Sequence, residues 1–322
     1  MQVLVTGGAG FIGSHLAQEL VRRGETVRVL DNLSTGRRQN LPEAAVQFVA
    51  GDVADMETVR AAVEGCELVF HQAALVSAPQ SLAEPVGNHQ VNVTGFFNVL
   101  EAARQAGARR VVYASSAAVY GNLPALPKTE DAPVQLLTPY AAAKRMNELY
   151  AGVYSAAYGL ETIGLRYMNV FGPRQNPTSP YSGVLSLFCR AALSGQPCTI
   201  YGDGEQTRDF IFIADVVQAL VRAAGVDSTV CAANPILNIG RGEQTSLNQI
   251  VALLGDLLGR TVAVRYAPPR PGDIRHSLAD IRRARVALGF QPQRTIRDGL
   301  ALTLAWFEQQ MEEGELSPLP EQ

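Results

Sequence analysis

The stretch VLVTGGAGFIGSHLAQELVRRG, residues 3–24, decides the fold. It joins an apolar, β-branched run to a glycine-rich turn and then to an amphipathic helical pattern. Gly7, Gly10 and Gly13 permit a tight turn, let the backbone approach a pyrophosphate, and leave space for close helix packing. The N-terminus of the helix would then face the phosphates. The stretch is therefore typical of a dinucleotide-binding βα unit.

Acidic residues at the ends of the next two apolar runs indicate which dinucleotide binds. Asp31 comes 18 residues after the last of these glycines, near the interval expected for a carboxylate that binds ribose hydroxyls. Its charge would repel a 2′-phosphate, so the sequence favours NAD over NADP. Arg37 and Arg38 could receive such a phosphate, but their place after a glycine turn favours solvated loop charges. Asp52 is predicted to accept a hydrogen bond from the adenine amino group.

Strand-like and helical patterns alternate through the first half of the chain. Apolar runs occupy residues 2–7, 26–31, 46–52, 67–74, 109–116 and 161–172, and helical patterns lie at 12–23, 55–64 and 92–106. This alternation predicts an α/β fold with a doubly wound parallel sheet, a Rossmann fold. We expect an NAD-binding domain over 1–171 with a return segment at about 209–238. A smaller mixed α/β domain over 172–208 and 239–322 would bind the substrate, with the active site between the two.

Composition narrows the classes of partner. The 322 residues carry a net charge of −3 without a long basic run, which argues against nucleic acid. The four cysteines form no CxxC pair, and the histidines share no ligand spacing, so we expect neither a metal nor a disulfide framework. No stretch approaches the roughly 20 apolar residues of a membrane helix. The opening MQVLVTGG lacks the basic region of a signal peptide, so we expect a cytoplasmic protein without a membrane partner.

A second motif carries catalytic side chains. Tyr140 and Lys144 in YAAAK lie four residues apart, on one face of a predicted helix. Tyrosine has an ordinary pKa near 10, and an adjacent ammonium and a cationic nicotinamide would lower it enough for a base. Ser116 ends the apolar run 109–116, and Ala117 and Ala118 follow it. The run therefore offers a hydroxyl and no carboxylate at its end.

These motifs together resemble the extended short-chain dehydrogenase/reductase superfamily, and most closely its UDP-hexose 4-epimerases. The motifs TGGAGFIGSHL, DNLSTG, HQAA, VNVTGFFNVLEAA, SSAAVYG, PYAAAK, LRYMNVFGP, GDGEQTRDFIFIADVV and RPGDIRHSLAD carry the resemblance over nearly the whole chain. It implies an NAD-dependent isomerase with Tyr140 as base, Lys144 as its electrostatic and ribose partner, and Ser116 bridging the sugar O4. It also implies a homodimer formed through the helices at about 92–106 and 140–158.

The resemblance further implies a cofactor site and a UDP-sugar site. The expected cofactor residues are Gly7, Gly10, Phe11, Ile12, Gly13, Asp31, Asn32, Ser34, Thr35, Gly36, Asp52, Val53, Gln72, Ala73, Ala74, Asn92, Ser115, Tyr140, Lys144 and Tyr167. The expected substrate residues are Ser77, Ser116, Asn169, Thr199, Tyr201, Arg208, Arg270, Asp273 and Ser277. Among these, Arg208, Arg270 and Asn169 would bind the diphosphate. Asp273 would bind the uridine ribose, and Tyr167 would lie beneath the nicotinamide.

Two departures from the family pattern bear on cofactor and sugar. Many glucose/galactose epimerases carry a lysine near the cofactor phosphates, where this chain has Val76 and Ser77. Ser277, four residues after Asp273, stands where a tyrosine restricts relatives to UDP-glucose and UDP-galactose. A small residue there would admit a 2-acetamido group, although a serine at this place is also typical of a helix N-cap. The overall pattern is most similar to bacterial epimerases that interconvert UDP-GlcNAc and UDP-GalNAc.

Other activities remain open at this point. A UDP-glucose/UDP-galactose 4-epimerase or a UDP-GlcNAc uronate 4-epimerase would use the same residues. Dehydratases and decarboxylases of the same scaffold carry acidic residues where this chain has Ala117 and Ala118. A non-catalytic NAD-binding regulator would not require Ser116, Tyr140 and Lys144. The alanines therefore favour epimerisation.

Overall fold

A computed structural model describes residues 1–177, 183–233, 235–269, 274–317 and 319. Seven parallel strands form the central sheet, in the order β11-β6-β5-β4-β1-β2-β3. Their bounds are β1 Gln2–Thr6, β2 Thr26–Asp31, β3 Val46–Ala50, β4 Leu68–His71, β5 Arg110–Ser116, β6 Glu161–Tyr167 and β11 Ile236–Ile239. This is the doubly wound parallel sheet that the alternating pattern predicts, so the predicted fold class is confirmed.

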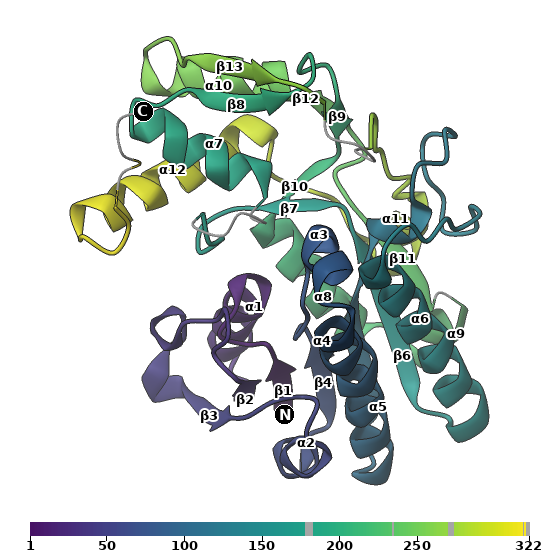
Figure 1. The fold of residues 1–322 in the computed structure, drawn as a ribbon. Helices are drawn as coiled ribbons and strands as arrows, with labels where there is room; N and C mark the ends of the chain where they lie inside the picture. Colours follow the sequence, from purple (N-terminus) through teal and green to yellow (C-terminus); the bar gives the residue numbers. More distant parts are fainter. Residues whose placement is uncertain (178–182, 234, 270–273, 318, 320–322) are drawn as a thin grey trace.

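Helices cover both faces of this sheet (Figure 1). α1 (Phe11–Arg22) packs against α8 (Ile213–Gly225) on one face, while α2 (Met56–Val63), α5 (Gly95–Gln105) and α6 (Pro139–Tyr158) pack together on the other. Alternation along β1 explains the two faces: Val3 and Val5 enter the first core and Leu4 enters the second. All three side chains are fully buried, as in a sheet covered on both sides.

The run 161–172 does not form the single strand that its sequence predicts. The chain leaves the main sheet at Met168 and continues as β7 (Asn169–Phe171), which pairs with β10 (Phe210–Phe212). The amide of Asn169 donates to the carbonyl of Asp209, 3.0 Å away, so the partner of the chain changes there. A short-range apolar pattern cannot report such a change of partner, because both halves of the run are equally apolar.

The remaining elements complete a second, smaller layer and several connections. The helices are α3 Ala78–Ala83, α4 Pro85–His89, α7 Val184–Leu193, α9 Ser228–Ala233, α10 Leu247–Leu258, α11 Arg282–Leu288 and α12 Ile296–Glu312, with a π-helical turn at Gln90–Thr94 and 3-10 turns at Arg38–Asn40, Glu43–Ala45 and Ala117–Tyr120. The short strands are β8 Cys198–Tyr201, β9 Thr207–Arg208, β12 Thr245–Ser246 and β13 Val264–Ala267. β11 and α8 belong to the expected return segment. β11 pairs with β6 in the main sheet, and α8 packs beside α1 on one face of that sheet. The proposed division into two domains remains a prediction.

Over the described residues, no helix combines the length and the apolar character needed to cross a bilayer. All four cysteines are buried free thiols. In the same described ranges, no three His, Cys, Asp or Glu side chains gather in a way that could hold a metal ion.

Candidate active site

The glycine turn forms one wall of a cavity of about 340 Å³. Gly7 has a φ of +65°, and a Cβ placed on it would lie 2.6 Å from the backbone nitrogen of Ala73. A Cβ on Gly13 would lie 2.2 Å from the carbonyl oxygen of Gly7. Neither position has space for a side chain, so the start of α1 packs directly against the glycine turn, and the turn packs against the segment that follows β4. The geometry matches the role that the sequence assigns to these glycines.

Most of the predicted cofactor residues line this cavity. They are Gly7, Gly10, Phe11, Ile12, Gly13, Asp31, Asn32, Ser34, Thr35, Asp52, Val53, Gln72, Ala73 and Ala74. Ser77, predicted to touch the substrate, also lines it, and its hydroxyl caps α3 by accepting the Gln80 amide at 3.0 Å. Gly36 does not line the cavity but packs against Ala9, because a Cβ on Gly36 would lie 2.9 Å from the carbonyl carbon of Ala9.

Asp31 is positioned to recognise ribose hydroxyls. Its two carboxylate oxygens accept the backbone amides of Ala9 at 2.9 Å and Leu33 at 2.8 Å. Each oxygen keeps a lone pair for a further donor. Asp52 is oriented in a similar way, because Asn32 donates to one of its oxygens and the Ala54 amide to the other, both at 2.8 Å. The glycine cradle and the acid on the cavity wall therefore fit a dinucleotide without a 2′-phosphate.

Two predicted cofactor residues have protein partners in this structure. The side-chain amide of Asn92 donates to the carbonyl of Leu75 at 2.9 Å and accepts the backbone amide of Leu75 at 3.0 Å. It also donates to the side chain of Asn88. Ser115 donates its hydroxyl to Glu148 of α6 at 2.7 Å. Asn92 thereby shapes the loop that follows β4, and Ser115 joins a buried network with Glu148. Neither residue lines the described cavity, and their contacts with the cofactor remain predictions.

The three predicted catalytic side chains meet at the end of β5. The hydroxyl of Ser116 interacts with that of Tyr140 and favours the ionised form of the phenol. Lys144 lies one helical turn further along α6, and its Nζ donates to the carbonyl of Ala114 at 2.9 Å. This ammonium is 5.8 Å from the centroid of the Tyr140 ring. Thr138 caps the helix by accepting the Ala141 amide, which fixes the first turn that carries Tyr140.

Tyr167, predicted beneath the nicotinamide, lies between this cluster and the cavity. Its hydroxyl donates to Oε1 of Gln72 at 3.1 Å, and Gln72 itself lines the cavity. Burial raises the pKa of Tyr167, and the nearby Tyr140 adds to that rise. The role beneath the nicotinamide remains a prediction.

Burial dominates the electrostatics of Tyr140. It raises the pKa of Tyr140 above the usual 10, and the interaction with Ser116 offsets only part of that rise. The lowering of this pKa that we expect from Lys144 together with a cationic nicotinamide remains a prediction. Burial also lowers the pKa of Lys144 to about 8, against an opposing effect of Glu148. A phenolate at Tyr140 thus requires a further positive charge beside it.

A buried ion pair lies directly behind Lys144, and sequence reasoning missed it. Arg166 of β6 binds both carboxylate oxygens of Glu148, at 2.7 and 2.8 Å. Arg145 and Ser115 add a hydrogen bond each to the same carboxylate. Nε and Nη2 of Arg166 face the acid, and Nη1 donates to the hydroxyl of Tyr120 at 2.9 Å. From the sequence, the i, i+4 spacing of Lys144 and Glu148 could have indicated that an acid lies next to Lys144.

The predicted substrate residues lie on three neighbouring segments of the smaller layer. Arg208 is on β9, Thr199 and Tyr201 are on β8, and Asn169 is exposed on β7. Arg270 and Asp273 lie outside the described residues, so their roles remain predictions.

Ser277 lies beside Arg208, because its amide donates to the carbonyl of Thr207 at 3.1 Å. α11 begins only at Arg282, so the alternative reading of Ser277 as a helix N-cap is wrong. Its hydroxyl is buried and has no hydrogen-bond partner within the described part of the chain.

Asp209 connects the segments around Arg208, and no motif in the sequence predicted this structural role. Its fully buried carboxylate accepts the amides of Arg241 at 2.7 Å, Gly242 at 3.0 Å and Ala279 at 3.1 Å. Burial raises its pKa to about 6, against the effect of these three amides. The strand with Arg208 is thereby fixed to the segment that carries Ser277.

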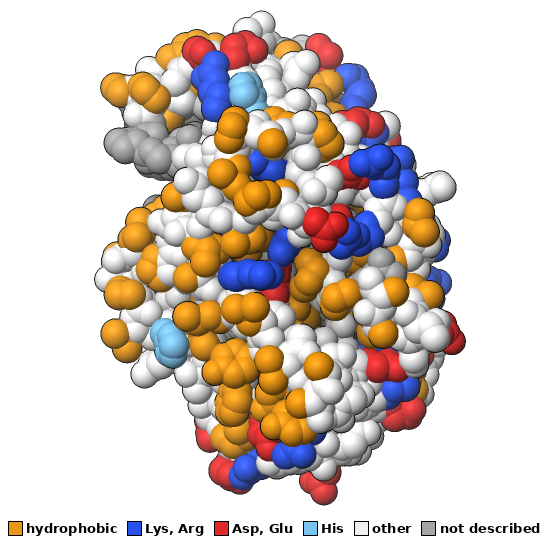
Figure 2. Space-filling model, turned by 90° about the vertical axis from the view of Figure 1, so that its right-hand side faces the viewer, with side chains coloured by type: hydrophobic (Ala, Val, Ile, Leu, Met, Phe, Trp, Pro, Cys, Tyr) orange, Lys and Arg blue, Asp and Glu red, His pale blue; other side chains and the backbone are white. Residues whose placement is uncertain are grey.

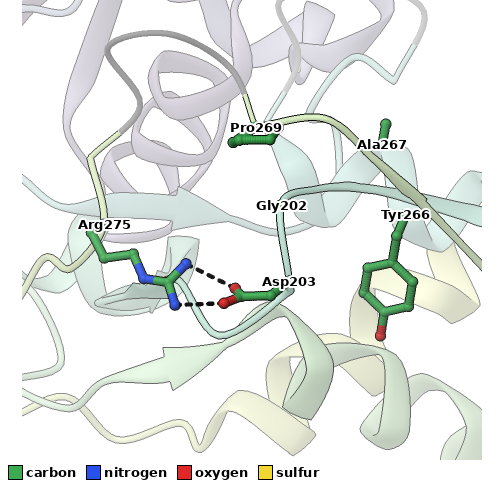
Figure 3. Close-up of a pocket in the computed structure, with 6 residues that line it drawn as sticks. All are labelled: Gly202, Asp203, Tyr266, Ala267, Pro269 and Arg275. Atoms are coloured by element: carbon green, nitrogen blue, oxygen red, sulfur yellow. Dashed lines mark hydrogen bonds and ion pairs between the residues drawn. The ribbon is translucent and has the colours of Figure 1, made fainter.

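A second hollow opens at the edge of the smaller layer (Figure 3). Gly202, Asp203, Tyr266, Ala267, Pro269 and Arg275 line it. Asp203 and Arg275 form a two-fold ion pair across it, with both N–O distances 2.8 Å. This pair lowers the pKa of Asp203 to about 2. Gly202, which lines this hollow, directly follows Tyr201 in the chain, so the hollow adjoins one of the predicted substrate residues.

Known proteins resemble this chain over nearly its whole length. Residues 3–240 match the NAD dependent epimerase/dehydratase family. A UDP-glucose 4-epimerase from Mycolicibacterium smegmatis is 41% identical over 313 residues, which cover 95% of this chain and 98% of that protein. The structure of a UDP-N-acetylglucosamine 4-epimerase from Methanobrevibacter ruminantium, in complex with UDP-N-acetylmuramic acid, superimposes with a TM-score of 0.92. It is 37% identical and covers 96% of this chain and 99% of its own.

A Thermus thermophilus UDP-glucose 4-epimerase in complex with NAD gives a TM-score of 0.87 at 38% identity, with 96% of this chain and 99% of that one covered. Identity and coverage at this level go beyond a shared fold, and the glycine turn, Asp31 and the cavity agree with the bound dinucleotide of that relative. The chain therefore belongs to the NAD-dependent epimerase/dehydratase family, and its cofactor is NAD.

Proposed function

We propose that this chain is a UDP-hexose 4-epimerase that interconverts UDP-GlcNAc and UDP-GalNAc. The observation that carries this proposal is the meeting of Tyr140, Ser116 and Lys144 at the end of β5, a strand that carries no carboxylate. The relatives named as UDP-sugar 4-epimerases support the reaction class.

In this proposal Ser116 and Tyr140 both contact the O4 hydroxyl of the hexose. Tyr140 takes the O4 proton as the C4 carbon is oxidised and returns it when C4 is reduced, so no proton is consumed over a cycle. NAD, when bound, supplies the hydride acceptor and donor at C4. Lys144 stabilises the phenolate and, through Ala114, stays fixed to the strand end. Asn169, Arg208, Arg270 and Asp273 are proposed to hold the UDP moiety.

The strand end also argues against the rival reactions. Elimination of water or loss of a carboxylate from the oxidised sugar needs an added acid or base beside C5. Ala117 and Ala118 are half-buried and begin a 3-10 turn capped by the Ser116 hydroxyl, which accepts the Ala118 amide at 3.1 Å. With methyl groups at these positions, hydride return is the route left to the 4-keto intermediate.

The choice of sugar rests on Ser277. A serine is much smaller than the tyrosine that would restrict the pocket, and its buried hydroxyl has no hydrogen-bond partner in the described part of the chain. UDP-glucose is the second candidate, because a 41% identical relative is named a UDP-glucose 4-epimerase. The ratio of kcat/KM for UDP-GlcNAc and UDP-glucose decides between them, and a clear preference for UDP-glucose would refute the N-acetyl assignment.

Replacing Ser277 by tyrosine is expected to lower kcat/KM for UDP-GlcNAc at least about 10-fold, while activity on UDP-glucose falls far less. The added ring would occupy the space of the acetamido group. Ser277→Ala serves as the matched control, because it removes the hydroxyl without adding volume. Equal activity of Ser277→Tyr on both sugars would contradict our account of the pocket.

We also propose that two copies associate through α5 and α6. Leu149 and Val153 are each 56% exposed on α6, and Met146, Tyr150 and Phe97 extend the same apolar face. Figure 2 views the molecule from the side of these helices and shows hydrophobic side chains gathered there. An apolar face of this kind is typical of protein–protein contacts.

Leu149→Glu is accordingly expected to convert a dimer to a monomer in sedimentation or light-scattering experiments. A charged carboxylate would be buried at the centre of the contact without a partner. Val286→Glu is the control, because Val286 is exposed on α11, away from this face. A monomeric wild-type protein at micromolar concentration would contradict the proposed interface.

A further inference from the structure

Arg174 lines the cavity that the glycine turn forms, and no sequence motif predicted a role for it. It follows β7 in the segment that leaves the main sheet, and its φ of +67° is rare for a residue with a side chain. Its guanidinium reaches α1, where it donates to Gln18 at 2.9 Å and to Ser14 at 3.4 Å. These two residues are one turn apart on the helix that follows the glycine turn. A residue from the second half of the chain is thus held against the start of α1.

The charge of Arg174 has no carboxylate partner among the described residues. Its two hydrogen bonds go to a neutral amide and a hydroxyl, while its burial lowers its pKa from the usual value without removing the charge. His15 fixes the same loop by a 3.0 Å hydrogen bond to the carbonyl of Pro173. Burial lowers the pKa of His15 to about 4, so it adds no positive charge at neutral pH. A fixed, half-buried cation without an anion is suited to an anionic ligand.

The place of Arg174 indicates which anion it meets. Arg37 and Arg174 are the cationic side chains that line the described cavity, and Arg37 belongs to the loop after β2. Arg174 instead lies along α1, whose N-terminus and glycine turn face the phosphates of a bound dinucleotide. Val76 and Ser77, from the loop after β4, also line the cavity and carry no positive charge.

We propose that Arg174 binds the diphosphate of NAD and supplies the cation that the loop after β4 lacks. The guanidinium fork can reach two phosphate oxygens while Gln18 and Ser14 hold it in place. This contact would tie the cofactor to the segment after β7 as well as to the glycine turn. It would therefore slow cofactor loss between turnovers, whichever sugar the protein uses.

The test compares dinucleotide fragments on protein stripped of NAD. Arg174→Gln is expected to weaken binding of NAD and of ADP-ribose by at least about 10-fold, because a charge-assisted contact to the diphosphate is lost. Adenosine, which has no phosphate, should bind the variant and the wild type equally in ligand-observed NMR. Arg174→Lys should keep part of the affinity for ADP-ribose. Arg22→Gln, at the exposed end of the same helix, is the matched control and should change none of the three affinities.

Two results would overturn the proposal. Unchanged affinity for ADP-ribose in Arg174→Gln would show that the guanidinium does not contact the diphosphate. An equal loss for adenosine and ADP-ribose would show that Arg174 only shapes the loop against α1. Neither result bears on the choice of sugar, which the Ser277 variants test separately.

Discussion

Replacing Tyr140 by phenylalanine is expected to lower kcat for epimerisation by about 10³-fold or more while NAD remains bound. The ring keeps its packing in the start of α6, so only the hydroxyl that faces Ser116 is lost. Without it the O4 proton has no acceptor within the cluster. Tyr158→Phe, on the exposed end of the same helix, is the control and should retain full activity.

The pH dependence of kcat/KM tests the same assignment independently. Because burial raises the pKa of Tyr140, only a small fraction is a phenolate at neutral pH, and activity should rise as the pH increases. Lys144 has a pKa of about 8 and loses its charge above that value, which removes a group that stabilises the phenolate. Lys144→Met should therefore move the rising limb to higher pH. Tyr140→Phe with more than a tenth of wild-type kcat would exclude Tyr140 as the base.

Contiguous motifs explain why the cofactor site was predictable from sequence. The contacts of Gly7 and Gly13 follow from steric limits that act within a few residues, and Asp31 is set by its place at a strand end. Distant partners were not predictable in the same way. The sequence cannot tell whether the hydroxyl of Ser115 faces a cofactor or Glu148, because that depends on the register of α6 against β5.

The predicted substrate residues depend even more on partners that are distant in the chain. Whether Ser277 caps a helix depends on where α11 begins, and the chain there is held in an extended form by Thr207 and by Asp209 through Ala279. Arg174 was missed because its side chain reaches a helix far earlier in the chain. Short motifs therefore identify the chemistry, while the fold decides which polar groups are free to perform it.

Glu148→Gln is expected to lower the free energy of unfolding by about 3 kcal/mol, because it leaves the charge of Arg166 buried and unpaired. The amide keeps the shape of the carboxylate, so packing is a minor part of the effect. Glu57→Gln is the control, since Glu57 forms an exposed ion pair with Arg60 on α2 and should cost well under about 1 kcal/mol. Urea denaturation at neutral pH measures both.

A double variant and a pH series separate the charge from the packing. Glu148→Leu combined with Arg166→Met should be more stable than Glu148→Leu alone, because no unpaired charge remains. The hydrogen bonds and charge of Arg166 hold the pKa of Glu148 below its usual 4.5 despite burial. Its stabilising effect is therefore complete above about pH 4.5 and is lost as the pH falls through the lower folded-state value. Lys144 stays protonated throughout this acid range, so it does not contribute. The difference between wild type and Glu148→Gln should consequently narrow as the pH is lowered, and a constant difference would mean that the carboxylate charge is not what stabilises this helix.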